Sequence, residues 1–172
     1  MLRPETHLFT FAIVGDTHVK PGSGDQSAPW KVNEKATARA RFIAREMARY
    51  EPKFIIHLGD LVHPVPELAT FPAAVALTQQ VFKQHHNSMH VLPGNHDIGD
   101  NPTAVGKPPS HPASEKDRDA FVGVFAEDRW QFEAAGWRFI GLNSLIMNTG
   151  LPSELEQMEW FVAQMSGANG KP

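Results

Sequence analysis

The sequence has 172 residues, of which 41% are apolar and 20% are charged, a composition typical of a single soluble globular domain. Its net charge of −3 gives no general attraction to nucleic acid or to an anionic membrane. The absence of cysteine excludes disulfides and thiolate metal sites. No apolar run approaches the ~20 residues of a membrane span, and residues 1–7 are too polar for the core of a signal peptide. The cytoplasm is therefore the default location.

The first half of the chain alternates short apolar runs with segments of helical periodicity. Three apolar runs predict buried strands: 8–14, 53–58 and 88–92. Between them we expect a helix from an Asn33 cap to about residue 50 and another from a Thr70 cap to about residue 86. Residues 20–30 are rich in turn formers and predict a loop. This β-α-β-α-β order predicts an α/β fold with a parallel sheet covered by helices.

The second half is less regular. Residues 97–117 predict a long loop and are followed by a short helix near 117–126. A hairpin with a turn at Ala135-Gly136 is expected from strands at 129–134 and 137–143. Ser153 and Glu156 have the spacing of a capping box and predict a last helix over 153–165.

Each predicted strand of the first half ends in a glycine that is followed by polar residues. These motifs are Gly15-Asp16-Thr17-His18, Gly59-Asp60 and Gly94-Asn95-His96-Asp97. The carboxyl ends of parallel strands meet at one edge of a sheet, so we expect these side chains to lie together. Carboxylates, an imidazole and an amide oxygen suit hard and borderline divalent cations. A pair of such ions can hold a phosphate and an attacking hydroxide for in-line displacement.

Four sequence segments together resemble the calcineurin-like metallophosphoesterase superfamily. GDTH at 15–18, GDLV at 59–62 and GNHD at 94–97 are similar to its first three signature blocks, at similar intervals. Residues 143–165 resemble the Asn-Ser strand end and the following helix of that family, with Gln157, Glu159 and Trp160. The resemblance implies an α-β-β-α sandwich with a dimetal site between the edges of two sheets.

The resemblance also implies a set of metal ligands. Asp16 and His18 would bind the first metal, Asp60 would bridge both metals, and Asn95 would bind the second. The ions would be two divalent metals, with Mn, Fe, Mg, Ni and Zn all suited to oxygen and nitrogen ligands.

The third motif would carry the proton chemistry. By the resemblance, His96 faces the scissile phosphate and protonates the leaving oxygen as general acid, and Asp97 orients His96 by a hydrogen bond. A neighbouring carboxylate favours the imidazolium form that a general acid requires.

Other histidines carry weaker signals. His63 stands three residues after Asp60, where a purple acid phosphatase would have a tyrosine ligand, so that branch is disfavoured. A contact of His63 with substrate or metal and a solvent-exposed loop role both stay open. His57 lies in an apolar run and is expected to be a hydrogen-bonded core histidine. Surface positions are expected for His85, His86, His90 and His111, and a core position for Trp160-Phe161.

No histidine follows His111 in the sequence, whereas the family has later Gly-His and Gly-His-X-His blocks that supply three further ligands. We therefore interpret residues 1–172 as a single calcineurin-like phosphoesterase domain, truncated before its last metal-binding motifs and incomplete at the C-terminus of the sandwich. Two alternatives are a natural fragment with a weakened site and replacement of the missing ligands by His63 or His111. An uncovered sheet face would favour self-association.

The expected activity is metal-dependent hydrolysis of phosphomonoesters or phosphodiesters, with a metal-bound hydroxide as nucleophile and His96 as general acid. The alternative is a catalytically impaired fragment or a non-catalytic binding module that keeps the fold. A nucleotide-binding α/β domain is disfavoured because neither G-x-G-x-x-G nor G-x-x-x-x-G-K-[ST] occurs. Loops 20–30 and 98–116 carry no readable code for a particular phosphate ester.

Overall fold

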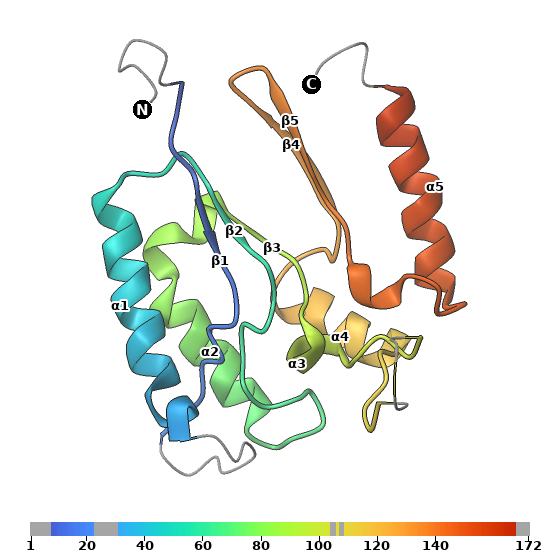
Figure 1. Ribbon diagram of the computed structural model, residues 1–172. Helices are drawn as coiled ribbons and strands as arrows, with labels where there is room; N and C mark the ends of the chain where they lie inside the picture. Colours follow the sequence, from blue (N-terminus) through green and yellow to red (C-terminus); the bar gives the residue numbers. More distant parts are fainter. Residues whose placement is uncertain (1–7, 23–30, 104–105, 107–108, 168–172) are drawn as a thin grey trace.

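A parallel sheet of three short strands lies at the centre of the computed structural model, which describes residues 8–22, 31–103, 106 and 109–167 (Figure 1). The strands occur in the order β1-β2-β3 and span Ala12–Val14, Ile55–His57 and Met89–Val91. Val14 pairs with His57, which pairs with Val91, so all three strands end at the same level. The α/β class and the parallel sheet are confirmed, and each strand is shorter than its apolar run.

The polar motifs continue this register beyond the strands. The backbone N–H groups of Asp16, His18 and Val19 donate to the carbonyl oxygens of Gly59, Asp60 and Leu61 at 2.9–3.0 Å. Val19 and Val62 then form a parallel bridge. The first two motifs therefore run side by side, which places their acidic side chains next to each other.

Helices α1 (Ala36–Arg49) and α2 (Phe71–Val81) cover one face of the sheet (Figure 1). Their apolar cluster contains Ala44, Met47, Ile55 and Phe82. The expected cap at Asn33 is wrong, because Asn33 lies in the 3₁₀ helix η2 (Lys31–Lys35) and Lys35 is the N-cap of α1.

The segment after α2 also differs from the expectation. The helix ends at Val81 and is followed by the 3₁₀ helix η3 (Lys83–Ser88). This turn brings His85 inward, where its Nε2 lies 2.8 Å from the carbonyl oxygen of Ala44. His85 is only 6% exposed, so its expected surface position is wrong. Thr70 is the N-cap of α2, as predicted, but its side chain makes no capping hydrogen bond.

The opposite face of the sheet is covered by a hairpin. Strands β4 (Trp130–Ala134) and β5 (Trp137–Gly141) pair antiparallel, and the predicted turn at Ala135-Gly136 is confirmed. Both turn residues have positive φ angles, as the twist of a two-residue hairpin requires. An apolar cluster joins the two sheets through Phe54, Ile56, Phe132, Ala134 and Phe139.

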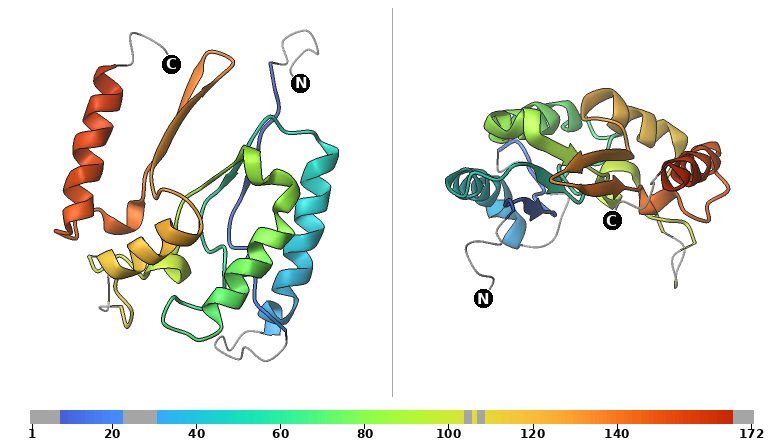
Figure 2. Two further views of the ribbon diagram at one scale, coloured as in Figure 1. Left: turned by 180° about the vertical axis from the view of Figure 1, so that it is seen from behind. Right: turned by 90° about the horizontal axis from the view of Figure 1, so that it is seen from above.

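Helix α5 (Pro152–Ser166) stands beside the hairpin, which completes the helix–sheet–hairpin–helix order expected for the α-β-β-α arrangement (Figures 1 and 2). The side-chain amide of Gln157 accepts from the N–H of Asn143 and donates to its carbonyl oxygen. Gln157 is fully buried, so this pairing fixes α5 to the end of β5. The expected capping box is wrong, because Leu151 is the N-cap and Ser153 lies inside the helix.

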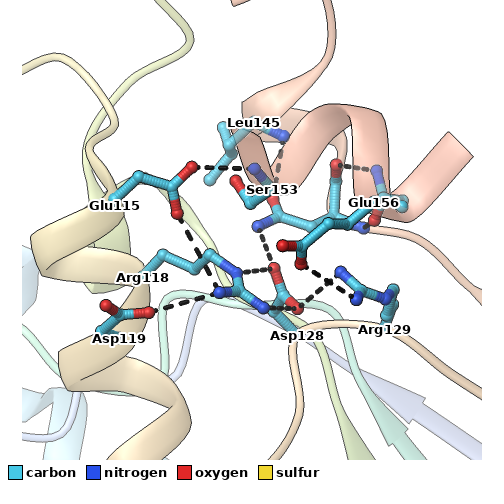
Figure 3. A network of polar contacts seen from close by, with 10 residues as sticks. Glu115, Arg118, Asp119, Asp128, Arg129, Leu145, Ser153 and Glu156 are labelled. Atoms are coloured by element: carbon cyan, nitrogen blue, oxygen red, sulfur yellow. Dashed lines mark hydrogen bonds and ion pairs between the residues drawn. The ribbon is translucent and has the colours of Figure 1, made fainter. Parts of the chain in front are cut away.

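A polar network supports the same corner of the molecule (Figure 3). Arg118, on helix α4 (Glu115–Val124), donates two hydrogen bonds to the carboxylate of Asp128, which is fully buried. The side-chain amide of Asn143 donates to the same carboxylate. The network therefore links α4, the start of the hairpin and, through Asn143 and Gln157, helix α5.

Apolar side chains remain exposed on β1, on the segment that precedes it and on α5. They are Leu8, Phe11, Ile13, Leu155, Met158, Val162 and Met165. Trp160 and Phe161 are half-buried, so their expected core position is wrong. Self-association through an uncovered apolar face stays a prediction. Among the described residues, no helix combines the length and apolar character needed to cross a membrane.

Candidate metal centre

The residues expected to bind metal have an unusual backbone. Asp16, His18 and Asp60 have φ angles of 53°, 44° and 52°, in the left-handed region that L-residues rarely adopt. Such conformations persist where the surrounding structure enforces them, and they cluster at functional sites. Here the parallel pairing of residues 16–19 with 59–62 holds these conformations in place.

Asp16, His18 and Asp60 form a compact group of donor atoms. The Nε2 atom of His18 lies 3.5 Å from Oδ2 of Asp60 and 3.8 Å from Oδ1 of Asp16. One donor atom from each residue lies within 4.8 Å of the other two. Burial lowers the pKa of His18 more than the Asp60 carboxylate raises it. The imidazole therefore favours the neutral form, which is the form that binds metal ions.

Two glycines allow the second and third motifs to meet. A side chain at Gly94 would collide with the carboxylate and backbone of Asp60, and a side chain at Gly59 would collide with the backbone of Gly94. Because both positions lack a Cβ atom, the N–H of His96 can donate a 2.9 Å hydrogen bond to Oδ1 of Asp60. These two glycines therefore permit close contact between the strand ends.

A second group unites His18, His63 and His96. Their ring centroids are 4.7 Å apart for His18 and His96, 5.5 Å for His63 and His96, and 5.8 Å for His18 and His63. One ring nitrogen from each lies within 4.8 Å of the others. His63 is only 2% exposed, so the solvent-exposed interpretation is wrong. His63 therefore faces the other site residues from the loop after Asp60.

The orienting partner of His96 differs from the expected one. Nδ1 of His96 lies 2.9 Å from the carbonyl oxygen of His63. The carboxylate of Asp97 instead accepts from the N–H groups of Gly94 and Leu61, at 2.8 and 3.2 Å. Asp97 is fully buried, and burial raises its pKa to about 7. The expected hydrogen bond from Asp97 to His96 is therefore corrected: Asp97 ties the third motif to the loop after Asp60.

Asn95 is the first residue of the short helix α3 (Asn95–Ile98) and is half-buried. It directly precedes His96, whose backbone contacts Asp60. The structure thus brings the segment that carries Asn95 to the same edge of the sheet as the other two motifs.

Thr17 and His57 form hydrogen bonds that support the backbone of the second motif. The Oγ1 atom of Thr17 donates to the carbonyl oxygen of Leu61, and Nε2 of His57 lies 3.0 Å from the same hydroxyl. The N–H of Gly59 donates to Nδ1 of His57. These contacts require a neutral imidazole with its proton on Nε2, and burial lowers the pKa of His57 to about 3. The predicted core role of His57 is confirmed. No local sequence signal indicates the role of Thr17, because its partners become its neighbours only in the fold.

Comparison with known protein families identifies the arrangement. The sequence profile of the calcineurin-like phosphoesterases matches residues 9–165, which include all three motifs and helix α5 up to Met165. The chain belongs to the calcineurin-like phosphoesterase family. No significant match was found among curated individual proteins.

The donor atoms of this calcineurin-like phosphoesterase domain fit the dinuclear metal centre that is typical of its family. Carboxylate oxygens and imidazole nitrogens converge from two different strand ends, and Nδ1 of His18 is buried without a hydrogen-bond partner. Oxygen and nitrogen donors in this combination suit divalent ions such as Mn²⁺, Fe²⁺ and Zn²⁺.

Proposed function

We propose that this protein hydrolyses phosphate esters with the help of two divalent metal ions. Asp16, His18 and Asp60 hold the first ion, and Asp60 and Asn95 hold the second. The observation that carries the proposal is the convergence of two carboxylates on Nε2 of His18, at 3.5 and 3.8 Å, within a phosphoesterase domain. When bound, such ions polarise the phosphate and activate a water molecule for attack.

His96 serves as the general acid in this proposal. Its Nδ1 atom is engaged by the carbonyl oxygen of His63, which fixes the ring orientation. A general acid must be the imidazolium form of the ring, in which Nε2 also carries a proton, and this is the proton that passes to the leaving oxygen. Asp97 acts as a positioning residue, because its hydrogen bonds from Gly94 and Leu61 tie the segment that carries His96 to the loop after Asp60.

His63 contacts the substrate phosphate or a metal ion in this proposal. Its ring stacks on His96 at 5.5 Å and lies among the donor atoms of His18 and His96. The side chain can be changed without removing the bond to Nδ1 of His96, because that bond uses the backbone carbonyl of His63. His63→Gln therefore tests the ring alone.

The leaving group provides the sharpest test of these roles. Hydrolysis of 4-nitrophenyl phosphate, phenyl phosphate and bis(4-nitrophenyl) phosphate is measured with added Mn²⁺. Loss of a general acid lowers rates by about 10²–10⁴-fold, and the loss is largest for a poor leaving group. We expect His96→Asn to impair phenyl phosphate hydrolysis more than 4-nitrophenyl phosphate hydrolysis, and Asp60→Asn to impair both.

His86→Asn is the matched control, because His86 is exposed and lies outside both donor groups. Equal rates for the parent, Asp60→Asn and His96→Asn proteins would contradict the proposal. Binding of Mn²⁺ without turnover of any of these esters would instead support the non-catalytic binding module.

A further inference from the structure

We propose a separate metal site at Glu67, His111 and Asp117, which takes a divalent transition-metal ion such as Zn²⁺. The three side chains come from three segments: the loop before α2, the loop after α3 and the first turn of α4. None of them belongs to the groups around His18. This site is independent of the proposed hydrolysis.

The distances within this triad suit metal ligands better than hydrogen bonds. Nε2 of His111 lies 3.5 Å from Oδ2 of Asp117 and 3.7 Å from Oε1 of Glu67. Charge-assisted hydrogen bonds between nitrogen and oxygen are shorter, at about 2.7–2.9 Å. Ligands that surround a tetrahedral zinc ion at about 2.1 Å lie about 3.4 Å from one another. The triad therefore has the spacing of ligand atoms around an ion.

Two polar atoms of the triad are buried without a hydrogen-bond partner. These are Nε2 of His111 and Oδ1 of Asp117, and Asp117 as a whole is only 3% exposed. A buried carboxylate oxygen without a partner is unfavourable in the absence of a compensating charge. A cation between His111 and Asp117 would supply that charge and accept both lone pairs.

Hydrogen bonds with Ser114 hold Asp117 in place. The hydroxyl of Ser114 donates to Oδ2 of Asp117, and the N–H of Asp117 donates back to Oγ of Ser114. Second contacts of this kind orient metal-binding carboxylates. Glu67 is 41% exposed at its side chain, which leaves room for a water molecule as a fourth ligand.

The position of the triad suggests what an ion there would do. The N–H of Asp100 donates to the carbonyl oxygen of His111, and the N–H of Ala113 donates to the carbonyl oxygen of Asp100. Asp100 follows α3, the helix that begins with Asn95 and His96. An ion bound to His111 would thus fix the loop that lies against the end of this helix. Its role would be to order the loop rather than to take part in the chemistry.

Zinc titration by calorimetry tests the proposal in the full chain. The expected metal centre is first disabled by His18→Gln and Asp60→Asn, so that the remaining binding reports on the triad. We expect this double variant to bind one Zn²⁺ per chain. Adding His111→Gln or Glu67→Gln should weaken that binding at least about tenfold, whereas adding His86→Gln should leave it unchanged.

A second readout covers the case in which the combined variants fail to fold. Single His111→Gln and Glu67→Gln variants of the otherwise unchanged protein are loaded with Co²⁺, and the visible absorption of the bound ion is recorded. Each variant should lose one Co²⁺ per chain relative to the parent and the His86→Gln control. An unchanged metal content in both variants would overturn the proposal, as would an absence of zinc binding by a folded double variant.

Discussion

The backbone N–H of His96 donates a 2.9 Å hydrogen bond to Oδ1 of Asp60. This bond joins the proposed general acid to the proposed bridging ligand through the main chain. It leaves the other carboxylate oxygen, Oδ2, facing Nε2 of His18 at 3.5 Å. One aspartate therefore aligns the third motif with one oxygen and the first motif with the other.

The backbone of Gly94 lies in close contact with Asp60, so we expect Gly94→Ala to be destabilising. The new methyl group would collide with Asp60, so the free energy of unfolding should fall by about 1–3 kcal/mol. Affinity for Mn²⁺ should fall as well, because the carboxylate must move. Urea denaturation measures the first effect and calorimetry the second. Gly123→Ala is the control: its methyl group meets open space in α4, so stability should rise by up to about 1 kcal/mol. Equal effects from the two substitutions would contradict the steric explanation.

Metal binding should stabilise the folded state. We expect Mn²⁺ at about 100 times its dissociation constant to add about 2.7 kcal/mol to the free energy of unfolding, and EDTA to reverse the gain. Asp60→Asn should lose most of the gain, whereas Asp119→Asn, at an exposed position of α4, should keep it. Thermal unfolding with and without Mn²⁺ measures the difference. A full gain in Asp60→Asn would show that the ion binds elsewhere.

The stability of the protein should depend on the protonation of His57. Its pKa is lowered from 6.5 to about 3 because burial disfavours the charged ring. Above pH 6.5 the ring is neutral in both states, and its contribution is fully present. As the pH falls from 6.5 toward 3, the unfolded chain binds a proton that the folded chain does not, so stability is lost by up to about 1.4 kcal/mol per pH unit.

His57→Gln isolates this effect. The raised pKa of Asp97 acts in the opposite direction, because its contribution to stability is lost as the pH rises from 3.8 toward 7. The free energy of unfolding of the parent and of His57→Gln is therefore measured by urea denaturation at pH 7.5 and at pH 5. The loss of stability between the two pH values is then compared for the two proteins. We expect the parent to lose more stability than the variant. Parallel losses would show that His57 does not titrate as inferred.

The buried pair of Arg118 and Asp128 should be important for stability (Figure 3). Burial tends to raise the pKa of Asp128, but the hydrogen bonds from Arg118 and Asn143 outweigh this effect and lower it. Asp128→Asn should lower the free energy of unfolding by about 3 kcal/mol, because Arg118 would lose its buried partner. Asp119→Asn removes an exposed partner of the same arginine and should change stability by less than about 0.5 kcal/mol. Comparable losses in urea denaturation would contradict the importance of burial.

Local patterns in the sequence were sufficient for several features. The hairpin turn at Ala135-Gly136 and the buried strand that contains His57 follow from short-range composition and were confirmed. The three strand-end motifs, which contain Asp16, Asp60 and Asn95, also follow from the sequence, because parallel strands bring their carboxyl ends to one edge. Family membership follows from the same motifs.

The contacts between motifs were decided only by the tertiary structure. Three features depend on contacts between loops that are distant in the sequence. They are the separation of Asp97 from the ring of His96, the burial of His63 and the triad around His111. Hydrophobic periodicity and secondary-structure propensity describe one segment at a time and contain no information about contacts between distant loops. The identity of the donor residues at the strand ends therefore follows from the sequence alone. Which of these donor atoms lie close together depends on the fold, because the packing of the loops against one another sets the positions of their side chains.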